Sequence, residues 1–314
     1  MEKHKTNYHE PVLLEECISN LISDKDGIYV DCTMGGGGHS IAILQQLSAK
    51  GKVIAIDRDD DAIKFVSTNF FEWINKGQLI IVKNNFQNIS EVLSSKNILK
   101  VNGVLADLGV SSFQIENQDR GFSYLLSGEI DMRMDKQDEI SAKNILNSYS
   151  EESLSNIFYK YGEEPMSRRI AREVVISRNS KPINKTADLV LLIKKLSSGM
   201  HVVKILSRIF QALRIEVNKE LDALTKLLES LSEVLIPGGR VAIISYHSLE
   251  DRAVKQFFVS QSRTIEKSTH KAIPDKIVQP NFLMINKKPI TASVEELTLN
   301  KKSRSAKLRV AEKI

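Results

Sequence analysis

Residues 27 to 41 are Gly-Ile-Tyr-Val-Asp-Cys-Thr-Met-Gly-Gly-Gly-Gly-His-Ser-Ile, and this stretch decides the fold of the chain. Ile28, Val30 and Cys32 alternate with Tyr and Asp, which predicts a strand. Four glycines follow, and a helical pattern begins near His39. Because glycine lacks a Cβ and the first turn of a helix presents unpaired N–H groups, a ligand can lie directly against this backbone.

The composition is that of an ordinary globular enzyme. The chain has 314 residues, of which 42% are apolar and 26% are charged, enough for one large domain or for a domain with an insertion. No apolar run reaches the length of a membrane span, and the polar N-terminus does not resemble a signal peptide. We therefore expect a cytoplasmic protein without a membrane partner.

The net charge of +5 is distributed unevenly. From Arg252 onward there are 14 Lys and Arg against 5 Asp and Glu, whereas the preceding residues hold 30 against 34. Such a basic segment suits a polyanion such as nucleic acid, but a solvated lysine-rich tail explains the same charge. The two cysteines, Cys17 and Cys32, lack the spacing of a metal site, and no other cluster of ligand residues has it, so we expect no metal.

Strand and helix patterns alternate through the first part of the chain. The expected elements are a capped helix from about His9 with Pro11 in its first turn, strands at residues 28–32, 52–57, 79–82 and 101–108, and helices near residues 39, 62–66 and 89–93. Short apolar runs that end in a charged residue are typical of buried parallel strands. This alternation predicts an α/β fold with a parallel sheet.

Helical patterns without a strand then fill residues 115–215. They predict an inserted helical domain for substrate recognition within a discontinuous domain of residues 1–114 and 216–314. After the insertion we expect a long helix at residues 218–235 that ends at Pro-Gly-Gly, and a strand at residues 240–247. Residues 282–286 and 306–311 are expected to form a closing hairpin, with loop between them and at residues 261–280.

Two ligand classes bind a glycine loop in this position of a sheet: dinucleotides and S-adenosylmethionine. The dinucleotide pattern G-x-G-x-x-G fails, because the sixth residue counted from Gly35 is Ser40 and counted from Gly36 is Ile41. No Gly-Lys-Ser/Thr follows, which excludes a Walker loop. The pattern therefore disfavours a dinucleotide.

Acidic residues at strand ends favour S-adenosylmethionine. Asp57 and Asp107 close two predicted strands, and ligands of open α/β sheets bind beyond the carboxyl ends of the strands. The Asp57 carboxylate can accept hydrogen bonds from both hydroxyls of a ribose, and Phe86 can flank an adenine. Each residue also has an ordinary structural interpretation: Asp31 in the first strand can cap the loop backbone, and Phe86 can belong to the core.

Eight motifs extend this interpretation to the whole chain. They are Thr33-Met-Gly-Gly-Gly-Gly-His-Ser, Ala55-Ile-Asp-Arg-Asp, Asp107-Leu-Gly-Val-Ser-Ser, Arg120-Gly-Phe-Ser, Asp131-Met-Arg-Met-Asp, Tyr161-Gly-Glu-Glu, Phe210-Gln-Ala-Leu-Arg-Ile-Glu-Val-Asn and Ser245-Tyr-His-Ser-Leu-Glu-Asp-Arg. With them the chain resembles the bacterial small-subunit ribosomal RNA (cytosine-N4)-methyltransferase family (MraW-like). The resemblance implies a class I S-adenosylmethionine-dependent methyltransferase fold, Rossmann-like with a mostly parallel sheet and an antiparallel edge, plus an inserted all-helical domain.

The resemblance also implies an activity. It is methylation of the exocyclic N4 amine of one cytidine in the decoding region of 16S rRNA, with S-adenosyl-L-methionine as cofactor and the small ribosomal subunit as partner. The implied cofactor contacts are Gly37, Gly38, His39, Asp57, Phe86, Asp107 and Gln114. The chain departs from the family pattern at Met34, where phenylalanine is usual, and at Phe113, where proline is usual. Whether the substrate is free RNA or an assembled subunit, and whether the protein is a monomer or a homodimer, stays open.

The chemistry requires the amine, the methyl carbon and the sulfur to lie in line. The N4 lone pair is delocalised into the ring, so an acceptor on its N–H group would favour attack and then remove a proton. Asp107 is the first candidate by its location, and Asp131, Asp135 and His247 follow. The Asp131 segment can equally be a structural turn, and Ser248 can simply cap the helix that follows His247.

RNA must reach the site with its target base unstacked. Phosphate contacts are expected from Arg168, Arg169, Arg172, Arg208 and Arg214 of the insertion, although a solvated helix face explains such charges too. Two other function classes remain open: a non-catalytic RNA-binding or assembly factor with a retained cofactor pocket, and a methyltransferase on another cytosine or a small amine. DNA amino-methyltransferases of this fold usually carry Asp/Asn/Ser-Pro-Pro-Tyr/Phe, where this chain has Asp107-Leu-Gly-Val.

Overall fold

The computed structural model describes residues 11–197, 199–266 and 276–314 and divides the chain into two compact units. The first comprises Met1–Gly109 and Ala223–Ile314, and the second is Val110–Asp222. The second unit is longer at both ends than the insertion expected at residues 115–215, because Val110 and Val217 pack into its core. Within the described ranges, none of the helices combines the length and the apolar character that crossing a membrane requires.

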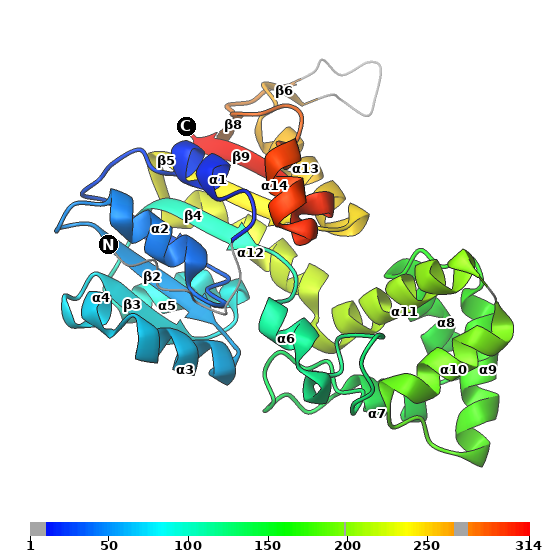
Figure 1. Ribbon diagram of the computed structural model, residues 1–314. Helices are drawn as coiled ribbons and strands as arrows, with labels where there is room; N and C mark the ends of the chain where they lie inside the picture. Colours follow the sequence, from blue (N-terminus) through cyan, green and yellow to red (C-terminus); the bar gives the residue numbers. More distant parts are fainter. Residues whose placement is uncertain (1–10, 198, 267–275) are drawn as a thin grey trace. The chain divides into compact units, whose positions relative to one another are not determined.

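The first unit is built on a seven-stranded sheet (Figure 1) with the strand order β3-β2-β1-β4-β5-β9-β8. The strands are β1 Ile28–Asp31, β2 Lys52–Asp57, β3 Leu79–Lys83, β4 Val101–Asp107, β5 Leu235–Ser245, β8 Phe282–Met284 and β9 Lys307–Lys313. Neighbours from β3 to β5 pair in parallel, whereas β9 runs antiparallel to both β5 and β8. The expected α/β fold with a mostly parallel sheet and an antiparallel edge is confirmed.

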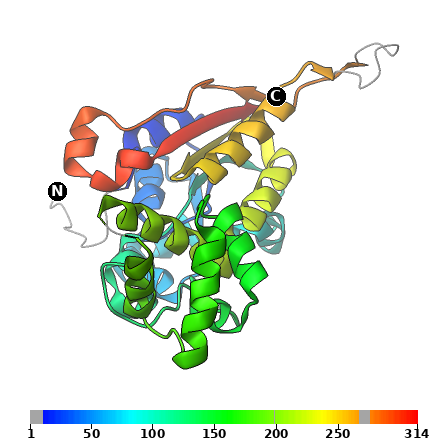
Figure 2. The same cartoon turned by 90° about the vertical axis from the view of Figure 1, so that its right-hand side faces the viewer.

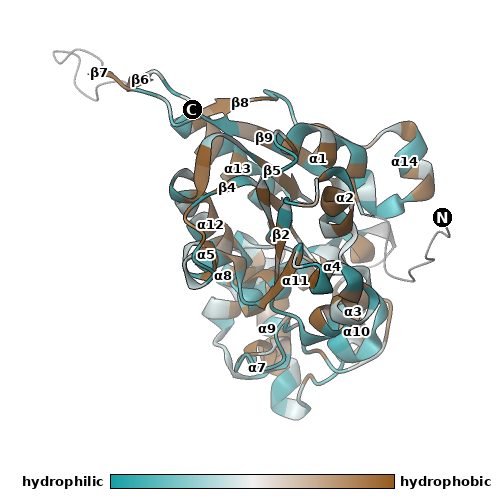
Figure 3. Ribbon diagram, turned by 90° about the vertical axis from the view of Figure 1, so that its left-hand side faces the viewer, coloured by the Kyte–Doolittle hydropathy of each residue, from teal (hydrophilic) through white to brown (hydrophobic). Residues whose placement is uncertain are grey.

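Both faces of this sheet are covered. Successive residues of a strand point to opposite faces, and in β2 Val53 and Ala55 join one buried cluster while Ile54 and Ile56 join the other. Helices α1 Leu14–Leu21, α2 Gly38–Gln46 and α3 Asp60–Asn69 contribute to the first cluster. Helices α5 Ile89–Ser95, α12 Glu220–Val234 and α13 Ser248–Gln261 contribute to the second. In Figure 3 the strands are correspondingly apolar along much of their length.

The remaining elements of the first unit are short. They are α4 Phe71–Asn75, α14 Val294–Leu299, the 3-10 helices η1 Phe86–Asn88 and η3 Lys301–Ser305, and a ribbon of β6 Ile265–Glu266 and β7 Lys276–Ile277. The closing hairpin of β8 and β9 is confirmed, but the segment between its strands is not the expected loop, because it contains α14 and η3. The loop expected at residues 261–280 is partly wrong, because β6 and β7 lie within it, and its residues 267–275 lie outside the described part.

Two boundaries differ from the sequence predictions. The opening helix begins at Leu14, because Leu13 adopts a left-handed conformation (φ 52°) and Pro11 precedes the helix instead of lying in its first turn. The prediction for His9 lies outside the described residues. Strand β5 begins at Leu235, before the Pro-Gly-Gly expected to separate helix and strand, and a register shift opposite Val101 and Gly103 accommodates the extra residues.

The second unit is helical (Figure 2), as the sequence predicted. Its elements are α6 Ser112–Glu116, η2 Gln118–Arg120, α7 Ala142–Ser148, α8 Glu151–Lys160, α9 Ser167–Ser180, α10 Thr186–Leu196 and α11 Met200–Asn218. Its core is formed by side chains such as Phe158, Ile170 and Ile209, all 0% exposed. In its described residues only an isolated bridge between Glu129 and Lys185 has β character.

Candidate functional site

Three aspartates lie at the carboxyl ends of neighbouring parallel strands. Asp31 ends β1, Asp57 ends β2 and Asp107 ends β4. Because these strands pair in parallel, the three carboxyl groups belong to the same edge of the sheet, where the glycine loop begins. This edge is the candidate site.

Asp31 forms hydrogen bonds with residues at both ends of the glycine loop. Its Oδ1 accepts a hydrogen bond from the Thr33 N–H at 3.1 Å, and its Oδ2 accepts one from the Ser40 hydroxyl at 2.6 Å. The side chain is fully buried, and burial raises its pKa, although His39 and the Ser40 bond oppose this shift. Asp31 therefore has the loop-capping role that the sequence left as an alternative.

Two glycines give the loop its path. Gly35 has a φ of +49°, and Gly37 has a φ of +81° and caps helix α2. A Cβ on Gly37 would lie 3.1 Å from the Phe70 ring and 3.2 Å from Val66, so both its conformation and its surroundings require glycine. The first turn of α2 follows at Gly38 and His39, where a helix can bind an anion through its backbone N–H groups.

Asp57 is held by the same loop. Its Oδ2 accepts from the Gly35 N–H at 2.7 Å and its Oδ1 from the Asp59 N–H at 2.9 Å. Burial raises its pKa from 3.8 to about 6, although these two hydrogen bonds lower it. Each carboxylate oxygen can accept a second hydrogen bond, so the group keeps acceptor capacity for a vicinal diol.

Asp107 is contacted from three sides. Its backbone N–H donates to Thr33 Oγ1 at 2.7 Å, its Oδ1 accepts from the Tyr246 hydroxyl at 2.7 Å, and its Oδ2 lies 3.8 Å from His39 Nδ1. The side chain keeps 23% of its surface exposed. Burial of the remainder raises its pKa to about 6, while His39 and Tyr246 lower it.

His39 takes part through its ring as well as its backbone position. Its Nε2 lies 3.0 Å from the Val12 carbonyl, which can only accept, so Nε2 carries a proton and Nδ1 faces Asp107. The ring is only 6% exposed. The sequence singled out His39 as a cofactor contact, and the structure places its ring between the opening segment and Asp107.

Tyr246 is the residue that sequence reasoning missed. It directly follows β5, the strand that neighbours β4 in the sheet, and it lies between Ser245 and His247 in a quoted motif. That position was the available signal, because consecutive residues at the end of a neighbouring strand reach the same edge of the sheet.

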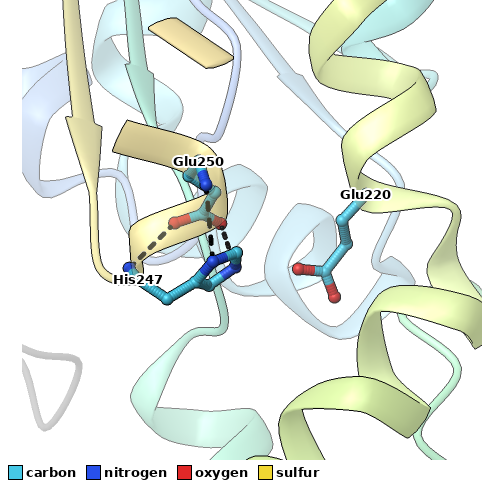
Figure 4. Close-up of side chains that lie close together, drawn as sticks. All are labelled: Glu220, His247 and Glu250. Atoms are coloured by element: carbon cyan, nitrogen blue, oxygen red, sulfur yellow. Dashed lines mark hydrogen bonds and ion pairs between the residues drawn. The ribbon is translucent and has the colours of Figure 1, made fainter. Parts of the chain in front are cut away.

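His247 and Glu250 form the capping box of α13 (Figure 4), so the alternative in which Ser248 caps this helix is wrong by one residue. His247 Nδ1 accepts from the Glu250 N–H at 3.4 Å, and Glu250 Oε2 accepts from the Tyr246 N–H at 2.9 Å and the His247 N–H at 3.4 Å. His247 Nε2 lies 3.1 Å from Glu250 Oε1. A catalytic role for His247 stays a prediction beside this structural one.

Phe86 opens η1 next to β3. It is half-buried and packs against the buried cluster that also contains Val104 and Ile56. The structure therefore gives it a core contact, and its contact with an adenine stays a prediction.

Gln114, Asp131 and Asp135 belong to the second unit. Gln114 is 5% exposed and closes a capping box with Ser111. The Gln114 Oε1 accepts from the Ser111 N–H at 3.0 Å, and the Ser111 Oγ accepts from the Gln114 N–H at 3.2 Å. Asp135 Oδ1 accepts from the Gln137 N–H at 3.0 Å. The predicted cofactor contact of Gln114 and the predicted catalysis by Asp135 stay predictions.

The Asp131 segment is a tightly held turn. Asp131 accepts from Arg133 Nε at 2.7 Å and Nη2 at 2.8 Å, and buried Met132 adopts a φ of +64°. The Arg120 guanidinium donates to the Arg133 and Met134 carbonyls at 3.0 and 2.9 Å, and Asn218 Nδ2 donates to the Met132 carbonyl at 2.8 Å. This is the structural turn that the sequence left open, and catalysis by Asp131 stays a prediction.

The basic residues of the second unit fall into two groups. Arg168, Arg169 and Arg172 are exposed on α9, with Arg172 Nε 3.7 Å from Glu151. Arg208 instead forms an ion pair at 3.3 Å with Glu164, which is 2% exposed. Arg214 donates to Glu220 through Nε at 2.8 Å and through Nη2 at 2.7 Å. The second group thus pairs with largely buried carboxylates, whereas the first is exposed on α9.

Comparisons with known proteins find relatives over nearly the whole chain. A model of the MraW methylase family matches residues 6–314. The ribosomal RNA small subunit methyltransferase H of Clostridioides difficile is 45% identical over 98% of this chain and 99% of that protein, and that of Chlorobium luteolum is 43% identical over 100% and 98%. Among solved structures, an rRNA methylase from Streptococcus thermophilus covers 96% of this chain and 93% of its own at 13% identity, with a TM-score of 0.42.

The strand order and the antiparallel edge are those of class I S-adenosyl-L-methionine-dependent methyltransferases, and this fold class, with S-adenosyl-L-methionine as cofactor, is confirmed. The family expected from the eight motifs is confirmed as well. On the match over residues 6–314, the chain is a member of the MraW methylase family.

Proposed function

We propose that this methyltransferase transfers the methyl group of S-adenosyl-L-methionine to the exocyclic N4 amine of a cytidine in the decoding region of 16S rRNA. The observation that carries the proposal is the Asp107 carboxylate at the end of β4, with one oxygen bonded to Tyr246 and part of its surface exposed beside the glycine loop. The relatives named as small-subunit ribosomal RNA methyltransferases support the choice of RNA.

The edge of the sheet fits a cationic cofactor. Asp31, Asp57 and Asp107 lie close enough that the charge of Asp31 raises the pKa of the other two. A positively charged sulfonium and ammonium would relieve this repulsion. When bound, S-adenosyl-L-methionine would supply an electrophilic methyl group; the Asp57 carboxylate would bind its ribose hydroxyls, and the N–H groups of Gly38 and His39 would bind its carboxylate.

Asp107 acts on the methyl acceptor. An ionised carboxylate accepts a hydrogen bond from the N4 amine, which orients the amine and increases the electron density on its nitrogen. The same oxygen then receives the proton that the amine loses. Since the pKa of Asp107 is raised to about 6, the group is ionised at neutral pH and is a stronger base than an exposed aspartate.

The second unit docks the RNA in this proposal. Three exposed arginines on α9, Arg168, Arg169 and Arg172, present a basic face of the kind that binds phosphates. Arg208 and Arg214 lie on α11 and not on this face, and they pair with Glu164 and Glu220, which are largely buried.

Mapping the transferred methyl group tests the proposal. The protein is incubated with methyl-labelled S-adenosyl-L-methionine and undermethylated small subunits, and the RNA is then digested to nucleosides. We expect label in N4-methylcytidine from the decoding region. Label in another nucleoside, or cofactor binding without any transfer, would overturn the proposal, and the second result would favour an RNA-binding assembly factor.

A further inference from the structure

Tyr246 joins two strand ends through one short hydrogen bond. Its hydroxyl donates to Asp107 Oδ1 at 2.7 Å, so the residue after β5 is tied to the last residue of β4. Burial and the adjacent Asp107 carboxylate raise the pKa of this hydroxyl far above its usual value. The hydroxyl therefore keeps its proton and is the donor of the bond to Asp107.

The tyrosine itself is firmly held. The Tyr246 backbone N–H donates to Oε2 of Glu250, which is 2% exposed, and the ring packs against the buried cluster of β2 and α2. Gly109 lies against the ring: a Cβ there would be 3.4 Å from Tyr246 Cδ2, and its φ of +107° also requires glycine. The position of the hydroxyl is thus fixed before any ligand binds.

This bond determines which oxygen of Asp107 faces a ligand. With Oδ1 engaged by Tyr246, rotation of the carboxylate is restricted and Oδ2 is the oxygen on the His39 side, 3.8 Å from Nδ1. His39 cannot turn away, because its Nε2 is bonded to the Val12 carbonyl. The chain therefore presents one defined oxygen.

We propose that Tyr246 is a positioning residue, which orients the Asp107 carboxylate so that Oδ2 accepts the hydrogen bond and then the proton of the amine that is methylated. This inference rests on the proposed function, because it assigns the residue a task in that reaction. Tyr246 does not touch the amine and acts only through Asp107.

A pH profile separates this role from a merely structural one. The titratable groups that face Asp107 are Tyr246 after β5, His39 on α2, Asp31 on β1, Glu250 on α13 and Cys17 on α1. Of these, Tyr246 and His39 favour the ionised carboxylate, whereas Asp31 and Glu250 disfavour it. Removing the Tyr246 hydroxyl must therefore move the acid limb of the rate profile to higher pH.

The test uses the full-length Tyr246→Phe protein with S-adenosyl-L-methionine and undermethylated small subunits. We expect kcat to fall on the order of 10-fold or more, as loss of a hydrogen bond to a charged group implies, with KM for the cofactor little changed and the acid limb shifted upward. The control is Tyr29→Phe, which removes a buried hydroxyl that bonds the Asp24 carbonyl at 2.8 Å and makes no contact with Asp107. Unchanged kcat and an unchanged acid limb in Tyr246→Phe would overturn the inference.

Two further measurements keep the inference testable by itself. Replacement of Tyr246 by 3,5-difluorotyrosine makes the hydroxyl a stronger hydrogen-bond donor and should move the acid limb of the rate profile to lower pH. This replacement tests the inference even if the Tyr246→Phe protein does not fold. Carbon-13 NMR of the Asp107 carboxyl should show a higher pKa in Tyr246→Phe even if the methylated nucleoside proves to be another one. An Asp107 pKa that is the same in both proteins would refute the positioning role and leave the proposed function untouched.

Discussion

Binding of S-adenosyl-L-methionine should weaken steeply as the pH falls below about 6. Both Asp57 and Asp107 have pKa values raised to about 6 by burial; both must be ionised to attract the cationic cofactor, and Asp57 must be ionised to accept the hydrogen bonds of its ribose. A group that must lose a proton before binding multiplies Kd by 1 + 10^(pKa − pH), so one group with a pKa of about 6 weakens binding roughly 10-fold at pH 5. If both ionise independently, the loss is about 100-fold.

Equilibrium dialysis with labelled cofactor between pH 4.5 and 7 measures this dependence. The range avoids titration of the cofactor's own amino group, whose ordinary pKa is roughly 7.7 to 8.0. Asp57→Asn removes one titrating group, so its Kd should be higher at pH 7 but should change only about 10-fold between pH 7 and pH 5. Circular dichroism at each pH confirms that the protein stays folded. A Kd that is constant from pH 7 to pH 5 in the unaltered protein would refute the assignment of these carboxylates to the cofactor site.

Three further predictions address stability and RNA binding. Gly37→Ala should lower the free energy of unfolding by about 1–2 kcal/mol, because a residue with a Cβ is strained at positive φ and this Cβ would press on the Phe70 ring, and urea denaturation measures the loss. Arg208→Gln should lower it by about 1–2 kcal/mol, because Glu164, 2% exposed, loses the half-exposed Arg208 guanidinium but keeps its bond from the Met166 N–H at 2.9 Å, whereas Arg168→Gln on the exposed face of α9 should change stability by less than about 0.5 kcal/mol. The double variant Arg168→Ala, Arg169→Ala should weaken binding to small subunits and reduce the slope of log K against log salt by about 2, and an unchanged slope would exclude these arginines from phosphate contact.

Much of the sheet could be predicted from the sequence because its strands are short apolar runs that end at charged or glycine residues. The strands that end at Asp57 and Asp107 were predicted for this reason, and their parallel pairing brings both carboxylates to the edge that the glycine loop also reaches. The helical character of the second unit followed from the 3.6-residue spacing of apolar residues, such as Ile170 and Val174 of α9, both 0% exposed.

Other features depend on contacts that no local pattern contains. The helical start was misplaced because Leu13 adopts a left-handed conformation that its sequence does not signal, while its N–H is bonded to Glu296 from the far end of the chain at 2.8 Å. The sequence offers Ser248 as an alternative cap of α13, since serine is a common cap residue, yet His247 takes this role with Glu250 as its partner.

The site also combines features that a local sequence pattern predicts with features that depend on long-range contacts. Asp57 and Asp107 could be named from their places at strand ends, whereas the bond between Tyr246 and Asp107 joins residues 139 positions apart. The ring orientation of His39 likewise depends on the Val12 carbonyl. Sequence patterns identify which backbone segments meet at the edge, but the choice of hydrogen-bond partners is made by side-chain packing after the fold has formed.

The most direct test of the account is the single-turnover rate of methylation by Asp107→Asn on undermethylated small subunits, with N4-methylcytidine measured by mass spectrometry. Asparagine keeps the shape of the side chain and an oxygen for the Tyr246 bond, but it cannot take up a proton. We predict a rate on the order of 10²- to 10⁴-fold lower than that of the unaltered protein at saturating cofactor, the range expected for loss of a general base. An unaltered rate of N4-methylcytidine formation in this variant would contradict the role assigned to the carboxylate at the end of β4.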